Sequence, residues 1–489
     1  MQNNMLRGQN SPTTGHHFID GISSESGNGQ TIAVTDPSTG LVFASIPRGT
    51  ATDIDRAVRS ARSAFNTRWS CTSAVERGRL LQRIGDAVLN HSDELATLEA
   101  QDTGKPSSQA KADVVALARY FEFYAGAADK LHGQTIPYLE GYTVMTVREP
   151  HGVTGHIIPW NYPMQIFGRS VAASLAAGNC CVVKPAEEAC LSILRVAQIA
   201  YKAGLPAGVF NVVAGYGKEA GAALSSHPDI NHLSFTGSAN TGTAIAQAAA
   251  TNHCPVTLEL GGKSPQIVFA DANLDAALPS LVNAIIQNAG QTCSAGSRVL
   301  IEASIYELVV EKLAERFAQL RTGPSSADLD LGPLVSATQQ QKVWDFLSDA
   351  HTSGLVFAAE GKIVEEAPSG GFYQAPVLLR DVPANHRLMQ QEIFGPILCV
   401  ASFADEADAI EMANNSPYGL VAGVWTSDGA RQFRMAKALR AGQVFINNYG
   451  AAGGVELPFG GMKHSGHGRE KGFEALYAFT TLKTIAIKH

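Results

Sequence analysis

The spacing of apolar residues along the chain switches repeatedly between strand-like and helix-like periods, which is typical of an α/β protein. Thr31 to Pro47 alternates apolar and polar residues around the turn Asp36-Pro37-Ser38-Thr39-Gly40 and predicts a β-hairpin. Apolar residues then recur with the period of amphipathic helices in three segments, Thr52 to Phe65, Ala74 to Leu98 and Lys111 to Leu131. The chain therefore begins with a small β-element followed by helices.

From about Gly152, strand-like and helix-like segments alternate regularly. Strands are expected at Val153 to Ile158, Cys180 to Lys184, Val209 to Val213, Asn231 to Phe235 and Pro255 to Leu260. The helices between them are expected at Asn161 to Ala177, Leu191 to Ala203, Lys218 to Ser226 and Ala239 to Ala250. This order predicts a parallel, doubly wound sheet covered on both faces, and such sheets bind ligands at the carboxyl ends of their strands.

A second α/β region is expected from Gln266 to about Phe445. The late segment Phe479 to Ile487 reads as a strand for which no later partner exists, and Tyr142 to Arg148 alternates with the same period of two. We therefore group these two strands in a small β-element for subunit association.

Composition and charge exclude several classes of partner. The 489 residues carry a net charge of −7, from 37 basic and 44 acidic side chains, without a basic stripe, so nucleic acid is not an expected partner. No apolar run approaches the roughly 20 residues that a membrane span needs. The first 17 residues are polar and predict a frayed tail without a signal peptide. The seven cysteines form neither a CxxC pair nor a zinc spacing, which indicates a reducing cytoplasm and no metal site.

One of these cysteines, Cys293, stands on a predicted turn between the helix-like run Ala277 to Gln287 and the strand-like run Arg298 to Ile301. Its loop, from Asn288 to Arg298, holds glycines on both sides of the thiol. Glycines let backbone N–H groups approach a ligand closely, and a thiolate there can attack a carbonyl carbon while N–H groups hold the oxyanion. The alternative is a buried and inert cysteine, which is the commoner fate of a cysteine taken alone.

Two glycine motifs follow predicted strands and open predicted helices. Gly215-Tyr-Gly217-Lys-Glu-Ala-Gly221 and Phe235-Thr-Gly237-Ser238 both stand where a pyrophosphate could approach a helix N-terminus. Either motif alone could be an ordinary turn. The two together favour a dinucleotide.

Polar side chains end three of the predicted strands. Asn161 could donate to a carbonyl oxygen or simply cap a helix. Lys184 and Glu187 could bind ribose hydroxyls, and an acid there disfavours a 2′-phosphate, although Lys184 could also be a solvated lysine. Glu259, on an otherwise apolar strand end, could become a general base because burial raises a carboxyl pKa, or it could only bond a glycine N–H. Glu392 is a comparable isolated acid.

These motifs together resemble the aldehyde dehydrogenase superfamily from about Asp20 to the C-terminus. The matching stretches are Pro-Trp-Asn-Tyr-Pro at 159–163, Phe-Thr-Gly-Ser at 235–238, Glu-Leu-Gly-Gly-Lys-Ser at 259–264, Gly-Gln-Thr-Cys at 290–293 and Glu-Ile-Phe-Gly-Pro at 392–396. Pro458 to Gly466 and Gly468-Arg469-Glu470 match the C-terminal signature of the family. We identify the chain as a member of that superfamily.

The resemblance implies an NAD-dependent, hydrolytic oxidation of an aldehyde, with NADP the less favoured cofactor. Cys293 would attack the aldehyde, Asn161 and the Cys293 N–H would hold the oxyanion, and Glu259 would activate the water that hydrolyses the thioester. The residues expected to be catalytic are Cys293, Glu259, Asn161 and Lys184. Those expected to bind the cofactor are Ile157, Pro159, Trp160, Lys184, Glu187, Gly217, Gly221, Phe235, Gly237, Ser238, Leu260, Glu392 and Phe394.

The resemblance also implies three parts. Residues 1–126 and 151–259 would form the cofactor domain and residues 260–460 the catalytic domain. Residues 127–150 and 461–489 would hold the oligomerisation strands and the C-terminal signature, giving a homodimer or a homotetramer.

The identity of the aldehyde stays open. Arg169 stands two helical turns after Asn161 and resembles an arginine that grips the substrate carboxylate in succinate-semialdehyde dehydrogenases, and Glu470 is a second expected substrate contact. The alternative for Arg169 is a surface or intersubunit ion pair. A CoA-acylating relative would lack Glu259, and a structural protein on this fold would not need an intact Cys293, Glu259 and Asn161.

Overall fold

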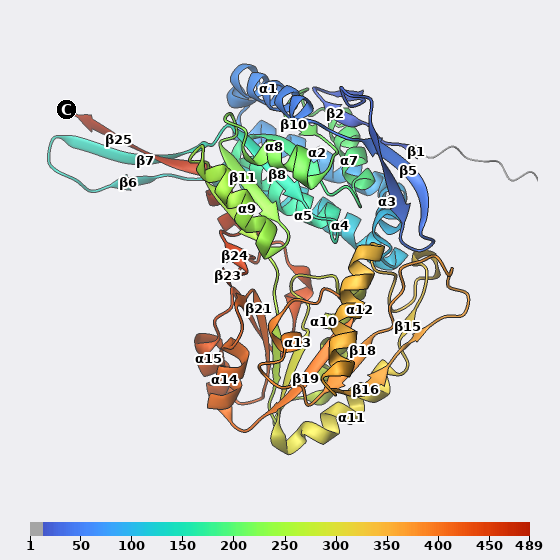
Figure 1. Ribbon diagram of the computed structural model, residues 1–489. Coiled ribbons are helices and arrows are strands. Elements are labelled where there is room, and N and C mark those ends of the chain that lie inside the picture. The colour runs from blue at the N-terminus through green and yellow to red at the C-terminus, as the bar shows by residue number, and fades with distance from the viewer. Residues whose placement is uncertain (1–12) are drawn as a thin grey trace, which may run out of the picture.

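The computed structural model describes residues 13–489, and two large sheets dominate it (Figure 1). The first sheet has eight strands in the order β24-β12-β11-β8-β9-β10-β2-β3. These strands are β2 (His17–Ile19), β3 (Ile22–Ser24), β8 (Val153–Ile158), β9 (Cys180–Pro185), β10 (Phe210–Val212), β11 (His232–Thr236), β12 (Val256–Glu259) and β24 (Gly466–His467). The five central strands, β8 to β12, run parallel, and every residue of β8, β9 and β11 is buried, as expected of a sheet covered on both faces.

The strand order reverses between β8 and β11. From β8 the chain proceeds to β9 and β10 on one side, and then returns to β11 and β12 on the other. Such a reversal opens a crevice at the carboxyl ends of the two strands, where open α/β sheets bind ligands. Pro159 and Gly237, which follow β8 and β11, stand at this crevice.

The helices of this part of the chain share one large apolar core with the first sheet. They are α1 (Ala51–Thr67), α2 (Ala74–Asn90), α3 (Ser92–Thr103), α4 (Ser107–Ala127), α5 (Pro163–Phe167), α6 (Ala173–Ala177), α7 (Leu191–Lys202), α8 (Ala222–Ser225), α9 (Ala239–Ala250) and, near the C-terminus, α16 (Glu474–Ala478). Beside them, β1 (Thr13–Thr14), β4 (Thr31–Asp36) and β5 (Leu41–Pro47) form a separate three-stranded sheet, which contains the predicted hairpin.

The second sheet has seven strands in the order β16-β18-β19-β14-β13-β21-β22, and all except β16 are parallel. They are β13 (Pro265–Val268), β14 (Arg298–Glu302), β16 (Val356–Glu360), β18 (Val377–Arg380), β19 (Ile397–Phe403), β21 (Val421–Trp425) and β22 (Gln443–Ile446). A second core joins this sheet to α10 (Leu274–Ile286), α11 (Tyr306–Phe317), α12 (Ala337–Thr352), α13 (Arg387–Gln390), α14 (Glu406–Asn414) and α15 (Gly429–Ala438). Two short strand pairs complete this region, β15 (Arg321–Thr322) with β17 (Lys362–Ile363) and β20 (Tyr418–Gly419) with β23 (Met462–Lys463).

A three-stranded antiparallel sheet projects from the body as an arm (Figure 1). It consists of β6 (Gln134–Ile136), β7 (Tyr142–Pro150) and β25 (Thr480–Lys488). The last strand, which lacks a later partner in sequence, pairs with β7 from Thr480 opposite Pro150 to Lys488 opposite Tyr142.

Three expected elements differ from the sequence prediction. The single helix expected from Ala74 to Leu98 is two helices, because at His91 the imidazole bonds the carbonyl of Ala87 and the backbone N–H turns to Val88. The helix expected from Asn161 begins at Pro163 and contains a π-helical turn over Gly168–Ala172. A second π-helical turn, Gly217–Gly221, precedes α8.

The expected frayed tail is also shorter than predicted. Residues 1–12 lie outside the described residues, but Thr13, Thr14 and His17 belong to strands. His17 is fully buried, and its Nδ1 accepts the N–H of Ala214 at 3.2 Å. The polar composition of the tail therefore gave no indication that His17 is buried. Within residues 13–489, no helix is both long and apolar enough to cross a membrane.

We predict that Asn179→Ala lowers the stability by about 2–3 kcal/mol, because it removes a buried side chain that bonds three backbone segments. Its Oδ1 accepts from Gly152, and its Nδ2 donates to Ser174 and to Phe479 at the base of the arm. Thermal unfolding at a fixed protein concentration measures the loss. Gln341→Ala, at an exposed helix position, is the control and should change the stability by less than about 0.5 kcal/mol. Equal midpoints for the two variants would contradict the assigned role.

Candidate active site

Five residues, 260–264, join the end of β12 in the first sheet to the start of β13 in the second. The carboxyl edge of the first sheet therefore faces the amino edge of the second across a short link. Asn161 and Glu259 stand at the first edge, after β8 and at the end of β12. Cys293 and Glu392 precede β14 and β19, which are paired neighbours, and so stand at the second edge.

The loop that carries Cys293 is strained and held by its own side chains. Asn288, Ala289 and Gly290 all have positive φ angles, of 48°, 52° and 75°. A side chain at Gly290 would collide with the carbonyl of Gly395. Asn288 Nδ2 donates to the Asn161 carbonyl at 2.9 Å, and Gln291 Nε2 donates to the Asn288 carbonyl at 3.0 Å. Non-glycine residues in this conformation persist only where neighbours fix them, which is common at functional sites.

Asn161 is buried and contacts this loop through both its side-chain amide and its backbone carbonyl. Its Nδ2 donates to the carbonyl of Gln291, two residues before Cys293, at 3.0 Å. The adjacent Tyr162 hydroxyl lies 3.0 Å from Thr292 Oγ1. One hydrogen of the Asn161 amide is thus used by the loop, and the second remains available because an amide nitrogen carries two donors.

A buried ionic cluster centred on Lys105 supports Asn161, and no sequence pattern predicts it. Lys105 Nζ donates to the Asn161 carbonyl at 3.1 Å and pairs with Glu99, at 3.4 Å, and with Asp113. The ammonium also lies 4.4 Å from the centre of the Tyr162 ring. Lys105 stands 56 positions before Asn161, so no local pattern connects the two residues.

The Cys293 thiol borders a cavity of about 410 Å³ whose wall also includes Asn161, Arg169, Tyr449, Phe459 and Lys471. The thiol is half-buried. Burial raises the pKa of Cys293 to about 11, against the opposing field of Arg169. The thiol is therefore protonated at neutral pH and needs a proton acceptor before it can act as a nucleophile.

Glu259 is a buried carboxyl group whose electrostatic field reaches Cys293. Its side chain is 1% exposed, and neither carboxyl oxygen has a hydrogen-bond partner among the described residues. A side chain at Gly460 would meet Oε1 at 2.8 Å, so the absence of one makes room for the carboxyl. Burial and the nearby Glu470 raise the pKa of Glu259 well above its ordinary value, and Arg169 opposes that shift.

Arg169 and Glu470, both expected to contact substrate, form a buried ion pair with each other. Ser234 Oγ also donates to Glu470 at 2.8 Å, and Arg169 Nη2 donates to Thr236 at 3.4 Å. Arg169 lines the cavity, whereas Glu470 does not. Arg169 does form an ion pair, as the alternative prediction had it, but the pair is buried within one chain and lies neither at the surface nor between subunits. The carboxylate of Glu470 already neutralises Arg169, which argues against Arg169 as the site for a substrate acid.

The link between the sheets passes through a space too narrow for side chains. A Cβ on Gly262 would lie 2.5 Å from the Cys293 carbonyl, and one on Gly261 would lie within 2.7 Å of the Glu392 carboxyl group. Glu392 Oε1 accepts the N–H of Gly262 at 3.0 Å, and burial raises the pKa of Glu392 to about 7. The two glycines thereby allow the Cys293 carbonyl and the Glu392 carboxyl group to approach the link closely.

A second polar group lies at the ends of β9 and β10. Lys184 Nζ donates to Glu187 Oε2 at 2.7 Å, and the N–H of Gly217 lies 3.4 Å from Glu187 Oε1. The space beside Gly217 is open. Acceptor and donor groups side by side at an open strand end suit a ribose diol.

The other expected cofactor residues lie around these two groups. Ile157 is in register with Lys184 on one side and Phe235 on the other. Trp160 packs edge to face against Phe394, at 5.3 Å between ring centres. Ser238 caps α9, Gly237 leaves room for the Phe235 ring, and Gly242 leaves room for Leu260. Pro159 follows β8, and Gly221 ends the π-helical turn.

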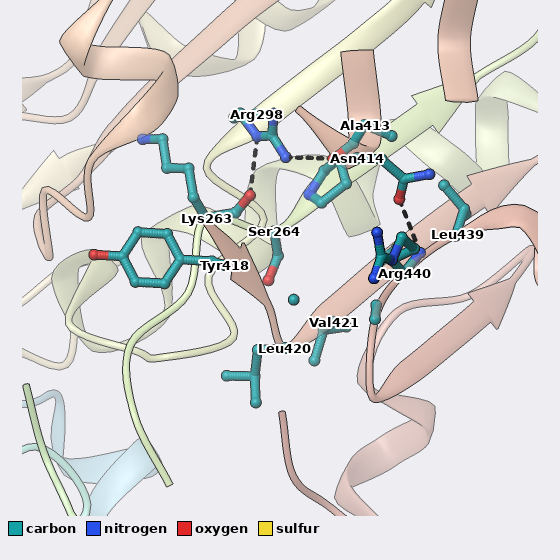
Figure 2. A pocket seen from close by; sticks show the side chains of 14 residues that line it. Lys263, Ser264, Arg298, Ala413, Asn414, Tyr418, Leu420, Val421, Leu439 and Arg440 are labelled. Carbon is teal, nitrogen blue, oxygen red and sulfur yellow. Dashed lines mark hydrogen bonds between the residues drawn. The ribbon is translucent and has the colours of Figure 1, made fainter. Parts of the chain in front are cut away.

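A much smaller cavity, of about 10 Å³, lies beside Lys263 and Tyr418 (Figure 2). Figure 2 shows the buried Arg298 guanidinium bridging the carbonyls of Lys263, at 2.9 Å, and Ala413, at 3.0 Å. Burial lowers the pKa of Arg298 to about 10. This space holds at most one water molecule, so it serves packing of the link and not substrate binding.

Comparison with known proteins agrees with this geometry. The sequence profile of the Aldehyde dehydrogenase family matches residues 23–485. Aldehyde dehydrogenase family 2 member B4 of Arabidopsis thaliana is 41% identical over 472 residues, which are 96% of this chain and 87% of that protein. A crystal structure of a Burkholderia cenocepacia protein classed as an aldehyde dehydrogenase is 68% identical, with a TM-score of 0.97 and coverage of 97% and 100% of the two chains. Betaine aldehyde dehydrogenase of Staphylococcus aureus, solved in complex with NAD+, is 34% identical, with a TM-score of 0.93 and coverage of 97% and 94%. These likenesses confirm the predicted fold class and the predicted superfamily.

We predict that alkylation of Cys293 by iodoacetamide accelerates about tenfold per pH unit between pH 7 and 10, because only the thiolate reacts and the thiol pKa is raised to about 11. Peptide mass spectrometry follows Cys293 and the exposed Cys71 in the same sample, so Cys71 reports the reagent. A Cys293 rate that reaches its plateau below pH 9 would show that the thiol ionises more readily than its surroundings imply.

Proposed function

The chain belongs to the aldehyde dehydrogenase family, and we propose that it oxidises an aldehyde to the carboxylic acid with NAD through a covalent intermediate on Cys293. One observation carries this proposal. A half-buried thiol, Cys293, borders a substrate-sized cavity, and Glu259, a buried carboxyl group without hydrogen-bond partners, lies close enough to help raise the pKa of that thiol.

In the first half of the reaction, the Cys293 thiol loses its proton to solvent water and its sulfur bonds to the aldehyde carbon, so that the carbonyl π bond opens and the oxygen becomes an oxyanion. The free hydrogen of the Asn161 amide and the backbone N–H of Cys293 stabilise that oxyanion. The Lys105 cluster and Asn288 fix Asn161 in place before the substrate arrives, which avoids reorganisation during the reaction.

A nicotinamide cofactor held by Lys184, Glu187 and Glu392 would supply the hydride acceptor for this step, and loss of hydride from the tetrahedral carbon would leave a thioester on Cys293. Glu259 then takes a proton from a water molecule, whose oxygen attacks the thioester carbon and releases the acid and the thiol. The raised pKa of Glu259 suits this step, because a carboxylate of ordinary acidity is a weak base.

The residues at the first edge fit the adenosine half of NAD, and Glu392 fits the nicotinamide ribose. Lys184, Glu187 and the Gly217 N–H offer donors and acceptors for two ribose hydroxyls. The Glu187 carboxylate would repel the 2′-phosphate of NADP. In this assignment Lys184 orients the cofactor and contributes to catalysis only through that orientation.

We keep residues 1–126 and 151–259 as the cofactor domain and residues 260–460 as the catalytic domain. In residues 127–150 and 461–489, the arm strands β7 and β25 would add to the sheet of a second copy, which gives a homodimer or a homotetramer. The cytoplasm stays the predicted location. Glu259 argues against a CoA-acylating enzyme, in which a thiol and not an activated water accepts the acyl group.

We predict that Glu259→Gln slows release of the thioester more than its formation, because only the activation of water requires the base. Rapid mixing with a simple aldehyde and NAD should show a burst of about one NADH per active subunit, followed by turnover at least roughly tenfold slower than in the wild type. Cys293→Ala is the control, which should form no NADH while it still binds NAD.

Two results would contradict these assignments. Turnover by Cys293→Ala would exclude Cys293 as the nucleophile. Loss of the burst in Glu259→Gln would mean that Glu259 is also needed to ionise Cys293.

We predict that Glu187 gives the enzyme its preference for NAD over NADP. Glu187→Gln keeps the shape of the side chain and removes the charge, so the ratio of kcat/KM for the two cofactors should fall by about tenfold, which corresponds to ~1.4 kcal/mol. Steady-state rates with NAD and with NADP measure the ratio. A wild type that uses both cofactors equally would refute the assignment.

A further inference from the structure

The wall of the large cavity is positively charged. Among its lining side chains within residues 13–489, the charged ones are Arg169 and Lys471, and none is an aspartate or a glutamate. Both cations flank the ring of Phe459, with the Arg169 guanidinium 5.0 Å and the Lys471 ammonium 5.6 Å from its centre. The two charges therefore lie together on one part of the wall.

The two cations differ in what they pair with. Glu470 neutralises Arg169 in a buried ion pair. Lys471 has no carboxylate within ion-pair distance in the part of the chain that the structure describes. Its Nζ donates to the carbonyl of Gly453 at 3.2 Å, which uses one of its three hydrogens. The charge that remains uncompensated at the cavity is that of Lys471.

The backbone at Lys471 adopts a strained conformation. Its φ angle is 60°, in the left-handed region that a lysine rarely adopts. Hydrogen bonds on both sides fix this conformation, since the Glu470 N–H and carbonyl both pair with Phe459 and the Gly472 N–H donates to Val455 at 2.7 Å. Strain of this kind persists where the neighbouring contacts impose it, and it directs the side chain to the cavity.

We propose that Lys471 is a specificity-determining residue, and that the cavity accepts aldehydes that carry a carboxylate at the end remote from the aldehyde. This inference rests on the proposed function, because it assumes that the aldehyde reacts at Cys293 in the same cavity. The Lys471 ammonium binds the remote carboxylate, and the rings of Phe445, Tyr449 and Phe459 border the body of the substrate. A substrate with a remote cation is repelled.

The electrostatic surroundings of Lys471 agree with this role. Burial and Arg169 lower the pKa of Lys471 to about 8, against the opposing fields of Cys293, Glu470 and Glu259. The ammonium is thus charged at neutral pH in a site that disfavours its charge. A bound carboxylate relieves that unfavourable charge, so binding an acid is more favourable here than at a solvated lysine.

The experiment compares matched substrates in matched variants. The substrates are 4-carboxybenzaldehyde against neutral 4-formylbenzamide, and succinate semialdehyde against butanal. The proteins are the wild type, Lys471→Gln and Lys471→Arg. All three residues are unbranched and not glycine, so they bear similar backbone strain, and glutamine and arginine can still donate to the Gly453 carbonyl.

In the wild type we expect kcat/KM to favour the acid of each pair, and betaine aldehyde to be a poor substrate. Lys471→Gln should lower kcat/KM for the acids by roughly 10-fold to 100-fold and leave the neutral aldehydes within about twofold. Lys471→Arg should retain the preference. If Lys471 only anchored the Gly453 loop, its loss would lower all four values alike and would overturn the proposal.

Two further measurements do not depend on Lys471→Gln turnover. Calorimetry should show that terephthalate, the acid product of 4-carboxybenzaldehyde, binds more tightly to the Cys293→Ala protein than to the Cys293→Ala/Lys471→Gln double variant. In the wild type, the acid-to-neutral ratio of kcat/KM should fall above pH 8 as Lys471 loses its proton, and in Lys471→Arg it should stay flat. The ratio cancels the titration of Cys293 and Glu259, which act on both substrates.

The outcomes separate the two proposals. Oxidation of the neutral aldehydes without any preference for acids, or a preference that survives in Lys471→Gln, overturns the role of Lys471 and leaves the proposed function intact. Failure of the wild type to oxidise any aldehyde overturns the proposed function.

Discussion

The arrangement of this molecule depends on the short connection from Glu259 to Pro265, which joins the carboxyl edge of the first sheet to the amino edge of the second. Two sheets with separate cores could otherwise be oriented in many ways. The link leaves no room for a side chain at Gly261 or Gly262, because Glu392 and the Cys293 carbonyl press on it from the two sides. Arg298 and Ser465 secure it further, through bonds to the carbonyls of Lys263 and Gly261. The residues that we assign to catalysis come from both sheets, so their mutual distances are set by this link.

The site stores unfavourable interactions that the surrounding fold maintains. Glu259 is buried without hydrogen-bond partners, Cys293 follows three residues with positive φ, and Lys471 is a charged group in a setting that opposes its charge. Each of these would destabilise an ordinary protein by an amount on the order of 1–3 kcal/mol. The network of Lys105 with Glu99 and Asp113 holds the Asn161 carbonyl, and Asn161 in turn donates to the Cys293 loop at Gln291, so this network helps to keep the loop from relaxing.

Much of this site follows from the sequence by topology. Asn161, Lys184 and Glu259 end or follow parallel strands of one sheet, so their meeting at one edge was predictable from the alternation of strands and helices. What the pattern could not supply was long-range side-chain pairing: Arg169 with Glu470, or Lys105 with Asn161, leaves no local periodicity. The predicted position of Arg169 also assumed 3.6 residues per turn, whereas it lies in a π-helical turn that changes the phase of the helix. The break at His91 was missed because one side-chain bond to Ala87 decides it.

The Arg169–Glu470 pair gives a physical reason why an acidic substrate could bind in this cavity although Glu259, the proposed base, lies nearby. Glu259 and Glu470 together would repel an incoming carboxylate, and two neighbouring carboxylates would also resist being ionised at once. Arg169, bound to Glu470 and close enough to act on both Glu259 and Cys293, cancels much of that negative field without being free to hold the substrate itself. Lys471 is then left to face the cavity with its charge uncompensated. Glu470 and Lys471 are adjacent in sequence, yet the Glu470 carboxylate pairs with Arg169 inside the protein and the Lys471 side chain lines the cavity. The left-handed backbone at Lys471 is the local feature that separates the directions of these two opposite charges.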